Sequence, residues 1–400
     1  MITAEGKLFS GPVIIRGGCL IDGTGAAPIK DGAVLVDGAR IVAAGFAGEL
    51  MTMPHTEVID RGEETILPGL IDCHNHLSMD PSLPDYLNRM TDPIAEQTLR
   101  AAMLMRVDLE SGVTTARCCG DKEFLDIHCR RAVEDARLPG PRLLVATRGI
   151  KATHGHGFVG YPFDGPEAIV RAIRENVRAG ADLIKLFITG TLKGKGPIIS
   201  YPSREEIRTA ADEAHRAGLP ITTHCVGGPG LDWALEAGMD AIEHGYHITD
   251  DQLDRLCSSQ TRLVLTPSPI LSLERIQNLP PAAIAGHLAE RDEIRGRVSA
   301  ILRSGVAYGL GTDGMHGRLA QEAAFLVEMG AAPLQAVMAA TLSGAGVCGL
   351  SDELGSLEPG KSADIICVAG NPAEDITSLE HVTWVMKGGR IMKAMEREGK

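Results

Sequence analysis

The stretch Leu-Pro-Gly-Leu-Ile-Asp-Cys-His-Asn-His, residues 67–76, joins an apolar run to two histidines. His74 and His76 are two positions apart, and alternate side chains of a β-strand lie on the same face. Both imidazoles can therefore point into one space. Nitrogen ligands of this kind suit Zn, Mn, Fe or Ni better than Mg or Ca. The stretch predicts a strand that carries two metal ligands.

After these histidines, strand-like apolar runs alternate with longer segments of helical period. The expected strands are residues 70–77, 114–120, 142–149, 182–189, 220–226, 241–245, 262–268 and 307–313. The expected helices are residues 94–111, 122–137, 166–179, 203–217, 291–303 and further helix over 317–349. Several end at a glycine suited to a left-handed cap, as at residues 180, 218, 238 and 305. Repeated strand-helix alternation predicts a parallel (β/α)8 TIM barrel with its chemistry at the C-terminal strand ends.

Both ends of the chain read as β-structure. Early strands are expected at residues 13–21, 32–42 and 56–66, with an Asp37-Gly38 hairpin turn and no helix between them. Late strands are expected at residues 363–368, 382–386 and 390–392. We therefore expect an α/β protein in which residues 1–67 and 351–400 form one small β-sandwich domain. Residues 68–350 would form the (β/α)8 barrel.

Composition excludes several classes of partner. The 400 residues include 52 acidic and 39 basic side chains, for a net charge of −13. This balance argues against nucleic acid or an anionic membrane as a partner. The nine cysteines lack a disulfide or zinc-ribbon spacing, no secretory leader is evident, and no apolar run approaches the ~20 residues of a membrane helix. We expect a cytoplasmic homo-oligomer that acts on a small molecule.

Six residues lie where barrel strands would deliver them to the catalytic end, and all except Lys185 are of metal-ligand type. They are His74, His76, Lys185, His224, His244 and Asp313. A lone strand histidine is more often a hydrogen-bonded core residue, and His128, His215 and His381 are read as structural or surface residues. The four histidines at strand ends are better read as ligands. Asp313 alone would suit a helix N-cap, but in their company it is better read as ligand and general base.

Lys185 stands within an otherwise apolar strand, Asp-Leu-Ile-Lys-Leu-Phe-Ile. A buried lysine is unfavourable unless its charge is removed or paired. A neutral amine can react with carbon dioxide to give a carbamate, which can bridge two metals. The alternative is an ammonium paired with a nearby acid, and the chemistry alone leaves the two nearly even. The surrounding histidines favour the carbamate.

Together, Pro-Gly-Leu-Ile-Asp-Cys-His-Asn-His, the strand lysine, Ile-Glu-His-Gly and Gly-Thr-Asp resemble the amidohydrolase superfamily. The early Gly-Gly-Cys-Leu-Ile-Asp-Gly-Thr-Gly and late Gly-Ser-Leu-Glu-Pro-Gly-Lys-Ser-Ala-Asp resemble its flanking β-domain. Within the superfamily, the chain is most similar to the imidazolonepropionase-like group, which includes Xaa-Pro and Xaa-Arg dipeptidases and ochratoxinase-like amide hydrolases. Residues 138–142, 153–157 and 212–218 support this grouping.

The resemblance implies two divalent metal ions, with Zn expected and Mn, Fe or Ni as alternatives. His74, His76 and Asp313 would hold one ion, His224 and His244 the other, and carboxylated Lys185 would bridge them. True imidazolonepropionases lack this lysine, which counts against that activity. The dipeptidases usually show Thr-Gly-Gly-His-Gly where this chain has Thr-His-Gly-His-Gly at residues 153–157, and the loop at residues 190–196 also differs. Substrate identity therefore does not transfer.

Further residues are candidates for substrate contact. His156 is expected to be a catalytic oxyanion donor or substrate contact, with loop capping as an equal alternative. The other candidates are His154, Tyr201, Tyr246, His316 and Arg318, of which Tyr201, Tyr246 and Arg318 would bind a carboxylate. Residues 190–196 lack the spacing of a phosphate-binding loop and are expected to form a mobile lid.

The expected function is hydrolysis of an amide bond to an amino acid, in a dipeptide or an N-acyl amino acid. A metal-bridging hydroxide would attack the carbonyl, and Asp313 would transfer the proton to the leaving amine. The alternatives are a cyclic amide or amidine hydrolase, a deaminase, and a lactonase. A non-catalytic scaffold is disfavoured because every expected ligand position is filled.

Overall fold

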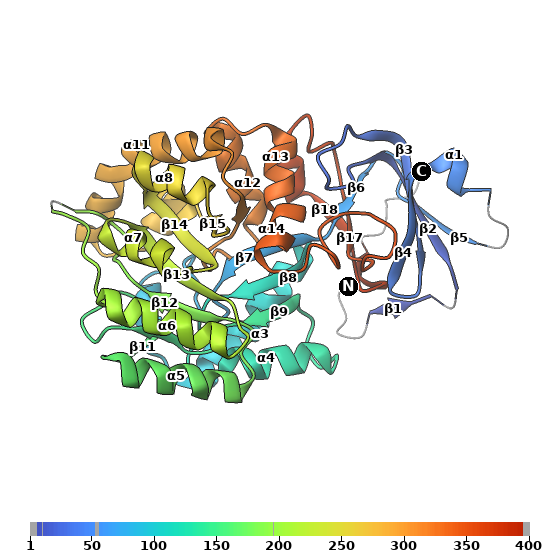
Figure 1. Cartoon of the computed structure of the whole chain (residues 1–400). Helices are drawn as coiled ribbons and strands as arrows, with labels where there is room; N and C mark the ends of the chain where they lie inside the picture. Colours follow the sequence, from blue (N-terminus) through green and yellow to red (C-terminus); the bar gives the residue numbers. More distant parts are fainter. Residues whose placement is uncertain (1–5, 10, 53–55, 195, 395–400) are drawn as a thin grey trace.

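The two ends of the chain combine in one nine-stranded sheet. The structure is a computed structural model that describes residues 6–9, 11–52, 56–194 and 196–394. The sheet runs in the order β1-β19-β18-β17-β6-β2-β3-β4, with β5 paired to β2. Blue N-terminal and red C-terminal strands lie side by side in Figure 1. Its strands are β1 Lys7–Leu8, β2 Val13–Leu20, β3 Ile29–Asp37, β4 Arg40–Phe46, β5 Glu57–Asp60, β6 Thr65–Pro68, β17 Ile365–Val368, β18 Val382–Lys387 and β19 Arg390–Ala394.

The sequence pattern explains this sheet in most places. β6 and β17 pair antiparallel, with Leu67 opposite Ile366, and so join residues far apart in the chain. The expected hairpin turn is present, with Gly38 at a φ of 55° that glycine adopts without strain. The expectation that no helix interrupts this region is wrong, because the short helix α1 (Ala47–Leu50) follows β4. Residues 1–5, 10, 53–55 and 395–400 of the expected β-domain lie outside the described residues, so the structure does not test the leader expectation at residues 1–5.

The middle of the chain forms two parallel sheets. One has the order β7-β8-β9 and the other β11-β10-β12-β13-β14-β15-β16. Each of the eight expected strand ranges overlaps one of these strands, with ends that differ by a few residues, and β10 and β11 are additional. Their bounds are β7 Leu70–Asn75, β8 Val113–Cys118, β9 Arg142–Val145, β10 Gly149–Lys151, β11 Gly160–Pro162, β12 Ile184–Phe187, β13 Ile221–Gly227, β14 Ala241–His247, β15 Arg262–Leu265 and β16 Tyr308–Leu310.

Hydrogen bonds connect the two parallel sheets at both edges. The amide of Asp182, just before β12, donates to the carbonyl of Val145 on β9 at 2.9 Å. The amide of Asp313, just after β16, donates to the carbonyl of His74 on β7 at 2.8 Å. The last parallel strand therefore lies beside the first, and the strand ends that carry the expected ligands meet.

Helices follow the parallel strands and surround them in Figure 1. Buried apolar residues from both strands and helices form one continuous cluster between these layers. The α/β alternation expected from sequence is confirmed. The helices are α2 Tyr86–Arg89, α3 Ile94–Glu110, α4 Leu125–Glu134, α5 Pro166–Ala179, α6 Arg204–Arg216, α7 Pro229–Glu236, α8 Asp250–Cys257, α9 Ser268–Leu271, α10 Leu273–Ile276, α11 Pro281–Ser304, α12 Leu319–Glu328, α13 Pro333–Ala339, α14 Leu342–Val347 and the 3-10 helix η1 Ile376–Glu380.

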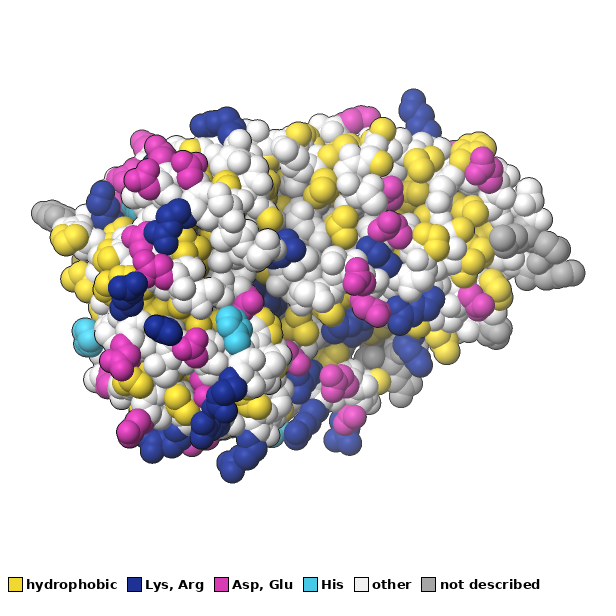
Figure 2. Space-filling model, viewed as in Figure 1, with side chains coloured by type: hydrophobic (Ala, Val, Ile, Leu, Met, Phe, Trp, Pro, Cys, Tyr) yellow, Lys and Arg dark blue, Asp and Glu magenta, His cyan; other side chains and the backbone are white. Residues whose placement is uncertain are grey.

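Two surface properties bear on partners. Among the described residues, the helices are all too short or too polar to cross a bilayer. Figure 2 shows acidic and basic side chains interspersed over one face of the molecule, so neither sign dominates that face. The excess of acidic residues is therefore spread on this face rather than gathered into one patch.

Candidate metal centre

The six expected ligands come together at the carboxyl ends of the parallel strands. His74 lies on β7, Lys185 on β12, His224 on β13 and His244 on β14, while His76 and Asp313 follow β7 and β16. His74 Nε2 lies 3.2 Å from His76 Nε2 and 3.3 Å from Asp313 Oδ1. The ring centroids of His244 lie 4.8 Å from those of His74 and 4.4 Å from those of His224. His74, His244 and Asp313 each offer a ligand atom within 4.8 Å of the others.

Three of the histidines are held by the nitrogen that faces away from this cluster. His74 Nδ1 lies 2.7 Å from Glu243 Oε2, His76 Nδ1 lies 2.7 Å from the Gly120 carbonyl, and His244 Nδ1 lies 2.7 Å from Thr266 Oγ1. A partner on Nδ1 that accepts a proton fixes the tautomer and leaves Nε2 free to bind a metal. Glu243 and the Gly120 carbonyl accept only, so His74 and His76 present Nε2 lone pairs to the cluster.

Two buried polar atoms of the cluster lack hydrogen-bond partners. They are Lys185 Nζ and His244 Nε2, and Lys185 is completely buried. Buried polar atoms are rarely left unpaired in native proteins. Burial and a neighbouring imidazole hold the pKa of both His224 and His244 well below the usual 6.5. Neutral imidazoles and an unpaired buried amine fit a metal centre whose metal completes their coordination.

Glu243 supports the cluster from beneath. Its carboxylate accepts hydrogen bonds from Arg117 and Thr222 as well as binding His74. Burial alone would raise the pKa of Glu243, but Arg117 and His74 outweigh it and hold the pKa well below its usual range. A carboxylate that stays ionised against His74 Nδ1 orients this ring and strengthens its basicity toward a metal.

Asp313 has an unusual backbone and a fixed carboxylate. Its φ is 50°, in the left-handed region that a non-glycine residue seldom adopts. Arg275 donates to the Asp313 carbonyl at 2.7 Å and to its Oδ2 at 2.8 Å, while Oδ1 faces His74 and His76. Burial would raise the pKa of Asp313, but Arg275 and these histidines hold it well below its usual range. The carboxylate is therefore ionised and ready to accept a proton.

A cavity of about 140 Å³ opens over the cluster. Burial lowers the pKa of His156 to about 4, so this imidazole is neutral at pH 7. Its Nε2 lies 3.2 Å from Thr191 Oγ1. Much of the remaining lining is apolar. The lining residues are His76, Met79, Tyr86, Leu87, His156, Gly157, Phe158, Val159, Phe187, Thr191, His224, His244, Tyr246, Pro269, Arg275, Leu279, Ala283, His287 and Asp313.

The structure brings some of the expected substrate contacts into this cavity and not others. His156 and Tyr246 line it, although the Tyr246 hydroxyl donates to the Thr266 carbonyl at 2.7 Å. His154 packs edge-on against Tyr201, with ring centroids 5.4 Å apart, and neither lines the cavity.

His316 and Arg318 also lie outside the cavity lining. His316 pairs with Asp108 at 2.7 Å beneath the cluster, and its Nε2 lies 3.2 Å from the His76 carbonyl. Arg318 pairs with Glu274 at 3.2 Å on an exposed surface.

Sequence reasoning missed Arg275 and the role of Glu243. Glu243 is adjacent to His244 in the quoted Ile-Glu-His-Gly, so a β-strand places its side chain on the face opposite His244. That alternation could have indicated a supporting carboxylate. Arg275 lies on the short helix α10 and belongs to none of the motifs, so no sequence signal marks it.

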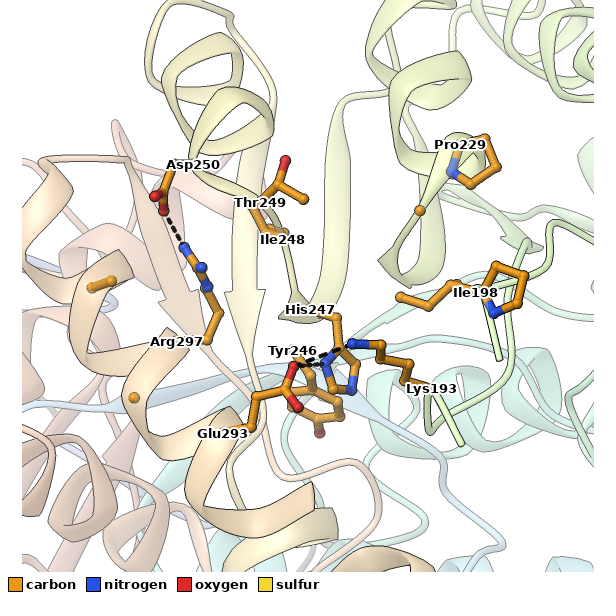
Figure 3. A pocket seen from close by; sticks show the side chains of 14 residues that line it. Lys193, Ile198, Pro229, Tyr246, His247, Ile248, Thr249, Asp250, Glu293 and Arg297 are labelled. Carbon is orange, nitrogen blue, oxygen red and sulfur yellow. Dashed lines mark hydrogen bonds and ion pairs between the residues drawn. The ribbon is translucent and has the colours of Figure 1, made fainter. Parts of the chain in front are cut away.

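A larger cavity of about 680 Å³ lies nearby but contains none of the expected ligands. Figure 3 shows Glu293 between Lys193 and His247, and Arg297 paired with Asp250. Tyr246 lines both this outer cavity and the inner one. The smaller cavity is the better candidate for chemistry because it meets the histidine cluster.

Comparisons with known proteins identify several proteins to which this chain is similar. Ochratoxinase from Aspergillus niger is 28% identical over 98% of this chain and 88% of its own length. A crystal structure of a Xaa-Pro dipeptidase with bound methionine is 28% identical with a TM-score of 0.83, covering 96% of this chain and all of the other. A prolidase complexed with N-methylphosphonate-L-proline is 25% identical with a TM-score of 0.87, also covering 96% of this chain and all of the other.

These similarities confirm the resemblance to the imidazolonepropionase-like and dipeptidase group. They also give the chain the α/β fold of its structural neighbours. The amidohydrolase family model matches residues 65–392, which include every candidate ligand. The chain is a hydrolase and belongs to the amidohydrolase family.

Proposed function

We propose that this hydrolase cleaves the amide bond of a dipeptide or an N-acyl amino acid at a centre of two divalent metal ions. The observation that carries the proposal is the buried, unpartnered Lys185 amine among four histidines and Asp313. An isolated ammonium in this position would lack any compensating hydrogen bond among the described residues. A carbamate on Lys185 would instead be a ligand, and carbon dioxide would supply its carboxyl group.

The ligand set extends this proposal. His74, His76 and Asp313 would hold one ion, and His224 and His244 the other, with Zn preferred over Mn, Fe or Ni. Divalent ions in such a site polarise a carbonyl and lower the pKa of bound water to about 7. We further infer that the parallel strands close into one (β/α)8 barrel over residues 68–350. Residues 1–67 and 351–400 would form the β-sandwich domain.

The chain's own residues supply the proton transfers. Asp313, ionised beside Arg275, accepts a proton from the attacking water as its oxygen bonds to the amide carbon. Asp313 then gives this proton to the leaving nitrogen as the carbon–nitrogen bond breaks, which yields an amine and a carboxylic acid that loses its remaining proton to solvent. His156 is neutral, and its imidazole can donate one hydrogen bond to the carbonyl oxygen as negative charge develops there.

The cavity supports a substrate with an apolar group and an anion. Met79, Leu87, Val159 and Leu279 contribute to its apolar lining. Arg275 lines the same cavity, and Asp313 takes only two of the five N–H groups that a guanidinium carries. A free carboxylate on the substrate would find its donors here. The proposal retains a small-molecule substrate, no nucleic acid or membrane partner, and a homo-oligomer.

Product identification tests the proposal. The protein, loaded with Zn and supplied with bicarbonate, is incubated with pooled dipeptides and N-acyl amino acids, and the products are read by mass spectrometry. Release of free amino acids that is absent in Asp313→Asn supports amide hydrolysis. If no member of the pool is hydrolysed by protein that binds two metal ions, the proposal of amide hydrolysis is rejected. Cyclic amides, amidines and lactones would then be tested as substrates.

A further inference from the structure

The loop after β12 enters the inner cavity. Its Thr191 lines the cavity and contacts His156 at 3.2 Å. Its Gly190 carbonyl lies 3.3 Å from His224 Nε2. Residues 190–196 were expected to form a mobile lid, and residue 195 lies outside the described residues. Hydrogen bonds hold the described part of the loop in place. The residue that accepts them therefore also positions Thr191 against His156.

Glu290 on α11 is this residue. Its Oε2 accepts a hydrogen bond from the Lys193 amide at 3.0 Å, and its Oε1 accepts one from the Gly194 amide at 2.7 Å. His247, at the end of β14, places Nε2 2.8 Å from Glu290 Oε2. The side chains of Glu290 and His247 are 11% and 3% exposed. One largely buried carboxylate thus joins the loop, helix α11 and strand β14.

Glu293, nearly one turn further along α11, provides a natural contrast. Its carboxylate lies 3.7 Å from Lys193 Nζ and 3.5 Å from His247 Nδ1, as Figure 3 shows. It is 59% exposed, and among the described residues it pairs with these two side chains rather than with loop amides. Exposed pairs of this kind contribute little to stability. The two glutamates therefore share a neighbourhood and differ in whether they hold the loop backbone.

We propose that Glu290 is a positioning residue that holds the loop so that Thr191 contacts His156, and that this contact determines which substrates are cleaved. The proposal rests on the proposed function for the role of His156. Hydrogen bonds from amides to a buried carboxylate are stronger than bonds between neutral groups. The two amides are adjacent in the chain, so one carboxylate fixes the backbone direction next to Thr191.

Amide hydrogen exchange of the metal-loaded protein tests this hold directly. Glu290→Ala should speed exchange at Lys193 and Gly194 on the order of tenfold, because it removes both acceptors. Glu290→Gln keeps one acceptor oxygen, so its exchange rates at these amides should lie between those of the wild type and of Glu290→Ala. This variant retains the test if the alanine variant does not fold. Glu293→Ala should change exchange less than twofold. Unchanged exchange in both Glu290 variants, or an equal rise in Glu293→Ala, would overturn the proposal.

Kinetics on a substrate found in the library separate positioning from a general structural role. Thr191→Val should lower kcat/KM by about the same factor as Glu290→Ala, on the order of tenfold, while leaving loop exchange protected. The double variant should be no worse than either single one, since both act through the same contact. Additive losses would overturn the link to Thr191. If the loop amides are protected from exchange in the wild type but no substrate in the library is hydrolysed, the role of Glu290 in holding the loop stands and only the proposed function is rejected.

Discussion

Replacing Lys185 with methionine gives opposite expectations for the metal-free and metal-loaded protein. Lys185 is completely buried, and its Nζ has no hydrogen-bond partner among the described residues. Its Nζ lies 5.2 Å from the centroid of the Phe187 ring. Methionine nearly preserves the shape of the stem and removes the unsatisfied group. The metal-free variant should therefore be more stable than the wild type.

The structure sets the size of both effects. An unsatisfied buried polar group costs about 1–3 kcal/mol, so the metal-free Lys185→Met variant should gain on the order of that amount. An ion present at a hundred times its dissociation constant stabilises by about 2.7 kcal/mol, so two ions add roughly 5 kcal/mol. Lys185→Met should lose much of the stabilisation that the metal ions provide, because the proposed bridging ligand would bind both ions.

Urea unfolding with and without Zn and bicarbonate, together with metal analysis, measures both quantities. Lys387→Met is the matched control, since burial lowers the pKa of Lys387 to about 8 and its amine donates to the Gly140 carbonyl far from the cluster. This control should lose about 1 kcal/mol of stability and keep the full metal response. Lys185→Met protein that binds two ions as tightly as the wild type would refute the assignment of Lys185 as a ligand.

Three further variants test other parts of the site. Asp313→Asn should keep most of the metal and lose turnover by orders of magnitude, measured by metal analysis and product release; near-wild-type turnover would remove Asp313 as the base. Glu243→Gln should destabilise by about 3–5 kcal/mol in urea unfolding, because it leaves Arg117 buried without its charge partner, and adding Arg117→Met should recover part of this loss. Burial would lower the pKa of His316, but Asp108 raises it to about 9. This folded-state pKa lies above the ordinary 6.5, so the pair stabilises fully below pH 6.5, and about 3 kcal/mol should be lost as pH rises through 9. A constant stability difference between wild type and His316→Gln over this range would contradict the pairing.

The sequence pattern predicted the parallel strands well because each is a short apolar run bounded by turn residues. It was less accurate where local periodicity is weak. Helix α11 begins at Pro281, ten residues before the expected start, because its first turns hold small residues such as Ala282 and Gly286 without an apolar stripe. The short helices α9 and α10 follow β15 in a proline-containing segment and were not expected. Their stability comes from burial rather than from helix propensity, since Ile270, Leu271 and Ile276 are buried and α9 packs against α11 and α12.

The positions of the six candidate ligands were predictable from the sequence, and most of the residues that hold them were not, for a physical reason. A ligand must stand at a strand end and be one of a few residue types, so position and chemistry together identify it. Strand alternation beside His244 could have indicated Glu243, but Arg275 and Glu290 act through geometry that only the folded chain creates. Arg275 reaches Asp313 from 38 residues away, and Glu290 reaches the loop amides from almost 100 residues away. The part of the site that sets specificity is therefore encoded in long-range contacts, and the substrate cannot be inferred from the ligand motifs that define the family.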